Sequence, residues 1–324
     1  MKYTFESSLG PHISGLIQQK RADGFSYTSD EYHLKKLDEF CAEFFPEVET
    51  VTRDIAEKWS LIRPTEGESY RNRRVYVLRQ LSLYILSLGC EAYVQRNING
   101  RNPKPVLYIP SRTEMSAFFA AIDSWECHNY CGRRTAAEYK MLFRLYYCCG
   151  LRLSEALNLR KEDVDFGNGT LTIYKSKGHK DRLVYLPPDG IQMIGKYLIN
   201  IEKTVPDSQW LFPGQDSKKA LSAAAIQHRF KDCWNSLPFA ADADKCPTPH
   251  CLRHAFVVER MNDWMLQGFD LQELLPYLSR YLGHKSPSET FYYYHLVNKA
   301  FAVVRAKDTV SSRVIPEVQD YGEI

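Results

Sequence analysis

Between Ile13 and Val94, apolar residues recur at helical spacing with only short breaks. The segment 28–45, TSDEYHLKKLDEFCAEFF, starts with a residue that can cap a helix and then places apolar residues three and four positions apart. The segment 69–89, SYRNRRVYVLRQLSLYILSLG, repeats this pattern and ends in a glycine. Residues at this spacing share one helical face, so the pattern predicts an all-helical first domain.

The pattern breaks in the segment 95–110, QRNINGRNPKPVLYIP, which is polar, basic and rich in proline. Each residue before a proline is pushed away from the helical region, so this segment is typical of a semi-extended linker. We therefore predict a helical domain over residues 1–105 with a linker to about 110. A second domain is expected over residues 111–305, followed by a tail over 306–324.

The second domain is predicted to be mainly helical with one β-hairpin. Residues 169–175 and 182–187, GTLTIYK and RLVYLP, are β-branched and aromatic runs on either side of the polar SKGHKD. Helical patterns resume at 222–237 and again near residue 249, where Thr248 can cap a helix and Pro249 is expected at its first position. The predicted fold class is mainly α with a small antiparallel β-sheet.

Composition narrows the class of protein only slightly. The chain has 324 residues, 44% of them hydrophobic and 25% charged, which is ordinary for a globular protein of two domains. A net charge of +3 allows an anionic partner without requiring one. Neither a signal peptide nor a run of membrane-spanning length is seen, so we expect a cytoplasmic protein.

The cysteines and short motifs favour neither metal nor nucleotide chemistry. There are nine cysteines, an odd number that an intracellular chain would keep reduced. The Cys and His spacings in 127–131 and 246–254 suggest zinc, but neither has a second well-spaced pair close by. No GxxxxGK[ST] or HExxH motif occurs. We predict no metal and no cofactor.

Four arginines cluster on the early turns of the helix predicted over residues 69–89. Such a run is often only a solvated face, but here no acidic residue is interspersed. The pattern therefore predicts a helix that follows DNA phosphates. The expected DNA contacts on it are Arg71, Arg73, Arg74 and Arg79.

Four elements of the second domain carry basic residues in marked local settings. Arg152 falls in the turn after Gly150, where it could simply pair with Glu155. His250 and Arg253 are three residues apart, so they share one helical face. His284 follows in LGHKSP. The tip of the predicted hairpin, where lysines are often only solubility devices, holds Lys175, Lys177, Lys180 and Arg182.

A row of three tyrosines, residues 292–294, follows His284 on a predicted short helix. Ser286 and Glu289 match a capping box, and Pro287 suits the first helical position. Because successive helical residues are turned by about 100°, at most one of the three tyrosines can face a given site. The other two are expected to be packing residues.

The order Arg, Lys, His-x-x-Arg, His, Tyr resembles the tyrosine recombinase (integrase) family, which includes the Xer, Cre and lambda-type integrases. The resemblance covers about residues 112–305 and is carried by GLRLSEALNLRKEDVD, KGHKDRLVYLP, HCLRH and LGH. In that family the nucleophilic tyrosine stands nine residues after the histidine of LGH, which here is Tyr293. Departures from the family pattern are minor, at Cys149 and Tyr185. The catalytic set that the resemblance implies is Arg152, Lys177, His250, Arg253, His284 and Tyr293.

The resemblance also implies roles for these residues. Arg152 and Arg253 would bind the phosphate oxygens, because guanidinium groups are planar and permanently charged. His250 would accept the tyrosine proton, and His284 would bind the phosphate or orient its neighbours. Lys177 would protonate the departing 5′-oxygen. Glu155 would be the structural companion of Arg152.

The family further implies a site-specific recombinase acting on double-stranded DNA through a 3′-phosphotyrosyl intermediate, without ATP or metal. The hairpin would lie along the DNA and bring Lys180 and Arg182 to it. A homotetramer would form on paired DNA sites, with the segment 296–310 docking on a neighbouring subunit and an accessory factor as a further partner. The opening of the chain is more similar to recombinases of mobile elements, which indicates integration, excision or transposition.

Three alternatives to this interpretation are distinguished on different grounds. A type IB topoisomerase uses a similar set of residues but relaxes supercoils of any sequence. A catalytically silent DNA-binding regulator would have no need to retain all six residues. A metal-dependent nuclease could be built on EDVD, residues 162–165, although that segment is better explained as a turn.

Overall fold

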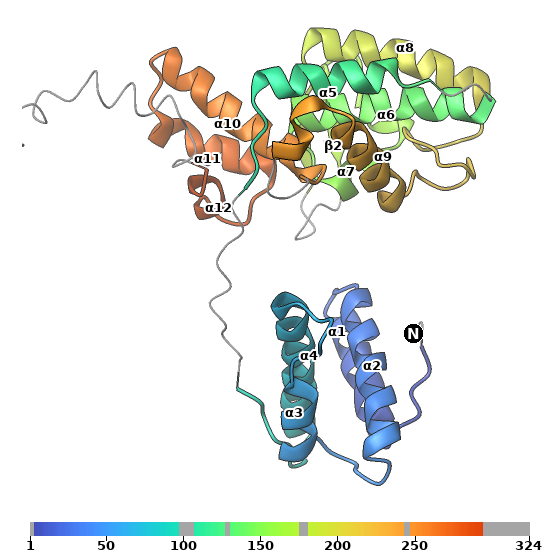
Figure 1. The fold of residues 1–324 in the computed structure, drawn as a ribbon, viewed down its shortest axis with the longest axis vertical. Helices are drawn as coiled ribbons and strands as arrows, with labels where there is room; N and C mark the ends of the chain where they lie inside the picture. Colours follow the sequence, from blue (N-terminus) through green and yellow to red (C-terminus); the bar gives the residue numbers. More distant parts are fainter. Residues whose placement is uncertain (1–2, 97–106, 127–129, 175–180, 243–246, 294–324) are drawn as a thin grey trace, which may run out of the picture. The chain divides into compact units, whose positions relative to one another are not determined.

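The computed structural model describes residues 3–96, 107–126, 130–174, 181–242 and 247–293 (Figure 1). The chain divides into two compact units, Met1–Pro105 and Val106–Ile324. Within the described ranges, no helix combines the length and the apolar character needed to cross a bilayer.

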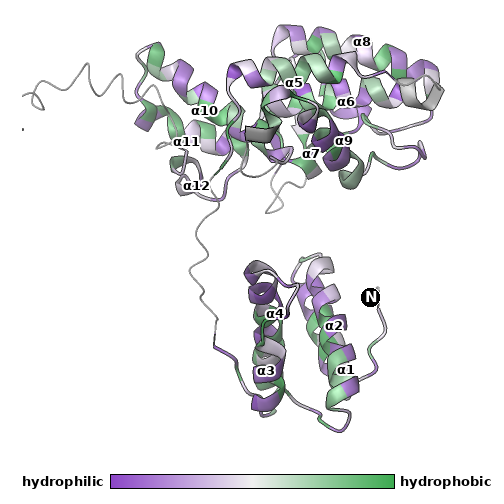
Figure 2. Ribbon diagram, in the orientation of Figure 1, coloured by the Kyte–Doolittle hydropathy of each residue, from purple (hydrophilic) through white to green (hydrophobic). Residues whose placement is uncertain are grey.

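Over residues 3–96, the first unit is a bundle of four helices with its own core. In α2, Leu34, Leu37 and Cys41 are buried on one face, as their spacing predicts. Helix α4 packs against the other three helices, and Figure 2 shows both hydrophilic and hydrophobic residues along each of them. The helices are α1 (Gly10–Ala22), α2 (Thr28–Phe44), α3 (Arg53–Ser60) and α4 (Glu68–Ser87).

The second unit is mainly helical. Helix α6 lies at its centre and packs against both α8 and α10. Its residues Leu142, Phe143 and Tyr146 are buried in the main core of the unit. The helices are α5 (Arg112–Ser124), α6 (Tyr130–Cys149), α7 (Leu153–Leu157), α8 (Pro188–Thr204), α9 (Ala223–Asn235), α10 (His250–Leu266), α11 (Leu271–Leu282) and α12 (Ser288–Phe291).

The predicted hairpin is present in a three-stranded antiparallel sheet of order β1-β2-β3. Strand β2 (Thr170–Ile173) pairs with β3 (Arg182–Tyr185), and Leu171 lies opposite Val184 with both side chains buried. The sequence did not predict β1 (Val164–Asp165), which is only two residues long and follows a 3-10 turn, Lys161–Asp163. The predicted fold class, mainly helical with a small antiparallel sheet, is confirmed.

Two helix starts differ by one residue from the prediction. Pro249 and Pro287 are the N-cap residues of α10 and α12, whereas each was expected at the first helical position. The predicted capping box at Ser286 is wrong, since α12 has no side-chain cap and the Ser286 hydroxyl lies 2.5 Å from the Ser288 hydroxyl instead. The described part of α12 is a single turn, so Tyr292 and Tyr293 follow it rather than lie in its second turn.

Candidate active site

Five of the six predicted catalytic residues lie in one cluster of the second unit. They come from the turn after α6, the start of α10, the turn after α11 and the turn after α12. The sixth, Lys177, lies outside the described residues, as does Lys180. The five are Arg152, His250, Arg253, His284 and Tyr293.

Arg152 is held in place by Glu155, as predicted. Gly150 ends α6 with φ at +60°, a conformation that favours glycine, and this turn sets Arg152 at the N-cap of α7. The carboxylate of Glu155 accepts hydrogen bonds from the Arg152 backbone N–H and from its Nη1, both at 2.8 Å. Since Glu155 is buried, its charge fixes the orientation of the Arg152 guanidinium.

The predicted DNA contact of Arg182 is corrected by the structure. Arg182 donates through both terminal nitrogens to the two carboxylate oxygens of Glu155 at 2.7 Å, and through Nε to the Tyr281 carbonyl at 2.8 Å. Its side chain is only 9% exposed. Arg182 therefore forms a bidentate ion pair with the same carboxylate that holds Arg152.

Gly283 allows the turn after α11 to approach these arginines closely. Its φ is +65°, and a Cβ atom at this position would lie 3.1 Å from Arg182 Nη1 and 3.2 Å from Arg152 Nη1. Its carbonyl accepts a hydrogen bond from Arg152 Nη2 at 2.5 Å. A side chain at this position would be strained by the positive φ and would press on both guanidiniums.

Arg253 joins the two turns that carry Arg152 and His284. It is 2% exposed and donates to the Gly150 carbonyl at 2.6 Å and to the Leu282 carbonyl at 2.8 Å. Burial, and then the charge of Arg152, lowers the pKa of Arg253 to about 10. The guanidinium therefore remains charged at neutral pH, and two positive charges lie in one largely buried site.

His284 is a neutral imidazole of defined tautomer. Its Nε2 lies 3.1 Å from Arg253 Nη2, and its Nδ1 lies 2.7 Å from the Thr290 hydroxyl. A guanidinium can only donate, so Nε2 accepts and the proton is on Nδ1, which donates to Thr290. Burial and the charges of Arg253 and Arg152 lower the pKa of His284 to about 3, which keeps the ring neutral.

His250 lies at the exposed edge of this cluster. Desolvation by the surrounding protein, followed by the charges of Arg253 and Arg152, lowers the pKa of His250 to about 4. Its ring meets that of His254 edge-on, with the two centroids 4.5 Å apart. His250 is therefore neutral near pH 7 in the DNA-free protein.

Tyr293 reaches the cluster from the same chain, with only 5% of the residue exposed. Its hydroxyl lies 2.6 Å from Nδ1 of His254. Burial raises the pKa of Tyr293 to about 12, although the charge of Arg253 opposes this shift. Tyr292 packs edge-on against Tyr293 with centroids 5.9 Å apart, and Tyr294 lies outside the described residues.

The sequence did not single out His254 as a site residue. It drew attention only in the Cys and His spacing that suggested zinc, and within the described residues no group of three potential ligands is placed to hold a metal ion. A usable signal was present, because His254 stands four residues after His250 and therefore lies near it on the helix surface.

The four arginines predicted to bind DNA in the first unit have different environments. Arg74 is 1% exposed, so its predicted DNA contact is wrong. It forms a buried ion pair with Glu66 at 2.7 Å, donates to the carbonyls of Trp59 and Leu61, and lies over the Trp59 ring. Arg74 therefore ties the segment between α3 and α4 to the bundle.

The other three arginines of this helix also have partners, but they are not buried. Arg71 donates to the Ser60 carbonyl at 2.7 Å, and Arg79 to the Gln95 carbonyl at 2.8 Å. Arg73 pairs with Asp30, and 47% of its side chain is exposed. Among these three, Arg73 has the most clearly exposed side chain.

Comparison with known proteins identifies relatives of this chain. The sequence profile of the phage integrase family matches residues 113–300. The integrase/recombinase y4rE of Sinorhizobium fredii is 36% identical over 156 residues, which is 47% of this chain and 49% of that relative. Tyrosine recombinase XerA of Pyrococcus furiosus is 26% identical over 262 residues, with 80% of this chain and 82% of the relative covered.

Solved structures share the fold. The XerH site-specific recombinase bound to a palindromic difH substrate has a TM-score of 0.64 at 23% identity, covering 86% of this chain and 78% of that one. The Tn1549 transposon integrase in complex with transposon right end DNA has a TM-score of 0.63 at 15% identity, covering 91% and 99% of the two chains.

The fold and the arginine, histidine and tyrosine cluster define a tyrosine recombinase, an enzyme of site-specific DNA recombination. The profile match spans more than half of the chain, so this protein belongs to the phage integrase family. The predicted family and class of enzyme are thus confirmed, and the alternatives of a topoisomerase or a silent regulator are not favoured.

Proposed function

We propose that this protein cleaves and rejoins DNA strands at specific sites through a 3′-phosphotyrosyl intermediate on Tyr293. The observation that carries the proposal is the convergence of the Tyr293 hydroxyl and the Arg253 guanidinium in one buried cluster of a single chain. Each subunit can therefore supply its own nucleophile to the phosphate that its own arginines bind.

Arg152 and Arg253 are proposed to bind the non-bridging oxygens of the scissile phosphate. The phosphodiester gains negative charge in the pentavalent transition state, and donors already held in place stabilise that charge without reorganising. Glu155 and the carbonyls of Gly150 and Leu282 hold the two guanidiniums before DNA arrives. In the DNA-free protein His284 Nε2 accepts from Arg253, so a contact with a phosphate oxygen would require a proton on Nε2.

The tyrosine hydroxyl must lose its proton as it attacks, because a phenol is a weak nucleophile. The family resemblance assigns the role of proton acceptor to His250. Lys177 is proposed to protonate the 5′-oxygen that leaves. The phosphotyrosyl ester conserves the energy of the broken linkage, so a 5′-hydroxyl of another strand can reseal the DNA without ATP.

The test is the formation of a covalent adduct on DNA fragments that flank the gene. We expect a detergent-resistant adduct in excess EDTA and without nucleotide, with Tyr293 joined to a 3′-phosphate at a reproducible sequence. Peptide mapping and sequencing of the trapped strand locate the two ends of the bond. Cleavage that strictly requires magnesium, or an adduct at random positions, would contradict the proposed function.

The biological task is proposed to be integration, excision or transposition of a mobile element, as the resemblance at the start of the chain implies. The first unit is proposed to be the core-binding domain, with Arg73 as its most exposed candidate for a phosphate contact. Because the substrate would be cellular DNA, we propose a cytoplasmic location, with an accessory DNA-bending factor as a further partner.

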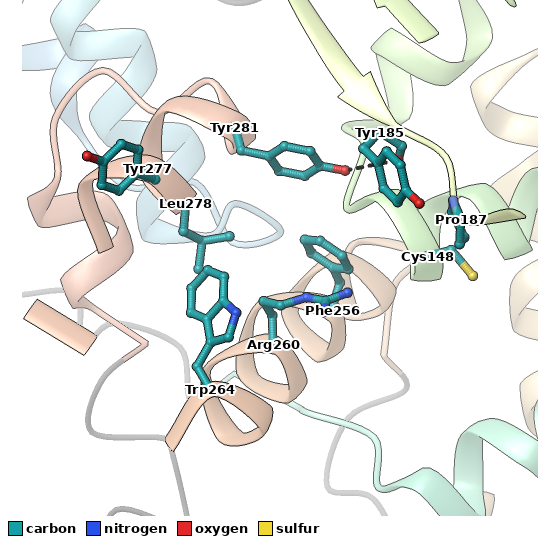
Figure 3. A pocket seen from close by; sticks show the side chains of 9 residues that line it. All are labelled: Cys148, Tyr185, Pro187, Phe256, Arg260, Trp264, Tyr277, Leu278 and Tyr281. Carbon is teal, nitrogen blue, oxygen red and sulfur yellow. Dashed lines mark hydrogen bonds between the residues drawn. The ribbon is translucent and has the colours of Figure 1, made fainter. Parts of the chain in front are cut away.

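A tetramer on paired DNA sites is proposed with the segment 296–310 as the connecting element, although that segment lies outside the described residues. The second unit offers an apolar pocket of about 420 Å³ between β3, α10 and α11 (Figure 3). None of the five clustered site residues lines this pocket, so a docked segment would leave the active site accessible to DNA. The walls are formed by Cys148, Tyr185, Pro187, Phe256, Arg260, Trp264, Tyr277, Leu278 and Tyr281.

Deleting residues from Ala306 onward is expected to leave single-site DNA binding intact and to impair synapsis and recombination. Tyr277→Asp should have the same effect, because this exposed residue would place a charge in the pocket without disturbing the core. Ile199→Asp, at an exposed position on α8, is the matched control. Gel-shift assays and a recombination assay separate the two steps. Full recombination by the truncated protein would refute docking through the tail.

A further inference from the structure

We propose that His254, and not His250, holds the hydroxyl of Tyr293 and receives its proton during strand cleavage. This inference rests on the proposed function, because it concerns how the same nucleophile is activated. It adds to the active site a residue that the sequence comparison with the recombinase motif did not assign.

The geometry favours His254 over its neighbour. A general base must lie within hydrogen-bond reach of the proton that it removes, at about 2.6–3.2 Å. His254 Nδ1 lies 2.6 Å from the Tyr293 hydroxyl, and the two rings are tilted with their centroids 5.4 Å apart. His250 occupies the exposed edge of the cluster and contacts the His254 ring.

Charge and burial define the direction of this hydrogen bond. The pKa of His254 is lowered to about 3 by burial and by the neighbouring His250 and Arg253, so the imidazole is neutral. The pKa of Tyr293 is raised to about 12, so the phenol is protonated. The tyrosine O–H therefore donates to Nδ1, and the proton of the His254 ring is on Nε2. The oxygen lone pairs of Tyr293 remain available for attack.

Arrival of the DNA phosphate changes the basicity of His254 in the required direction. Arg253 is one of the charges that hold the pKa of His254 down. A phosphate bound to Arg253 offsets that charge, so the neutral imidazole becomes a better proton acceptor when the substrate is present. The tyrosine thus keeps its proton in the DNA-free protein and can release it when a phosphate occupies the site.

The step balances in atoms and charge. A bond forms between the Tyr293 oxygen and phosphorus while the bond from phosphorus to the 5′-oxygen breaks. The tyrosine proton moves to Nδ1 of His254, which becomes an imidazolium, and the 5′-oxygen takes a proton from the Lys177 ammonium group. Rejoining runs the same transfers backwards, with His254 returning the proton to the tyrosine.

The test compares three single variants of the full chain, His254→Ala, His254→Asn and His250→Ala. The substrate is duplex DNA carrying the mapped cleavage site with sulfur in place of the bridging 5′-oxygen, so that leaving-group protonation does not limit the rate. Single-turnover adduct formation is followed from about pH 6 to pH 10. Asparagine keeps a hydrogen-bond acceptor near the position of Nδ1 but does not take up a proton at these pH values.

We expect His254→Ala to lose about 10²–10⁴-fold in rate, the range typical of a removed general base. His254→Asn should be slow near neutral pH, and its rate should rise about tenfold per pH unit as hydroxide removes the tyrosine proton. His250→Ala should lose less than His254→Ala. Thermal melting of each variant verifies that it is folded.

Several results would overturn the proposal. Full activity of His254→Asn with an unchanged pH profile would reduce His254 to a positioning residue. Faster cleavage by His254→Ala would show that the hydrogen bond restrains the nucleophile. A larger loss of rate in His250→Ala than in His254→Ala would assign the role of proton acceptor to His250. Failure of the proposed function is distinguishable, since the unmodified protein would then form no adduct at any pH.

Discussion

Tyr293→Phe is expected to abolish the covalent protein–DNA adduct, with a loss on the order of 10⁶-fold, as for removal of other enzymatic nucleophiles. The substitution keeps the ring that packs at the end of α12 and removes only the oxygen that would bond to phosphorus. It also leaves His254 Nδ1 without its present partner. The measurement is adduct formation on the mapped DNA site in a denaturing gel, with DNA binding followed separately.

The neighbouring tyrosines supply the controls for this prediction. Tyr292→Phe and Tyr294→Phe should leave substantial cleavage, since adjacent residues point in different directions and Tyr292 packs against the Tyr293 ring. Melting curves should show that Tyr293→Phe remains folded. An adduct that persists in Tyr293→Phe would move the nucleophile to a flanking tyrosine.

Lys177→Ala is expected to slow cleavage by about 10²–10⁴-fold on ordinary DNA, because the 5′-oxygen would depart without a proton. The bond to the 5′-oxygen breaks only with difficulty when its leaving group is an unprotonated alkoxide. Single-turnover cleavage rates at neutral pH measure this loss. Lys175→Ala and Lys180→Ala are the matched controls on the same hairpin tip and should lose much less.

Sulfur at the bridging 5′ position separates this role from a general loss of DNA binding. A thiolate leaves without protonation, so Lys177→Ala should recover most of its rate on that substrate. Tyr293→Phe should recover none, and His254→Ala should stay slow, because both act on the attacking side. Absence of rescue in Lys177→Ala would pass the acid role to Lys175 or Lys180.

Local sequence pattern was enough to predict the fold class and the family. The helical periodicity of 28–45 and 69–89 and the β-branched runs of the hairpin depend on residues close in sequence, and the structure contains the corresponding elements. Three motifs are also recognisable from residues close together in the sequence, namely the segment around Arg152, HCLRH and LGH. Glycines such as Gly150 mark helix ends because their backbone conformation is local.

Which side chains are exposed and which partners they meet was decided only by tertiary packing. Arg73 and Arg74 are adjacent in sequence, yet one is exposed and the other is buried against Glu66. Helical periodicity alone does not predict that the segment between α3 and α4 covers Arg74 and leaves Arg73 exposed. Arg182 likewise looks like a tip residue until β3 brings it to Glu155, 27 residues away.

The sequence by itself determined the identities of five clustered catalytic candidates and the order in which they occur. The tertiary structure alone decided that Glu155 is shared by two arginines and that Arg253 joins two turns. It also decided that the hydroxyl of Tyr293 meets His254, 39 residues earlier in the chain. The physical reason is that hydrogen-bond partners and burial depend on how distant segments pack, whereas motif spacing and backbone preference depend on neighbours along the chain.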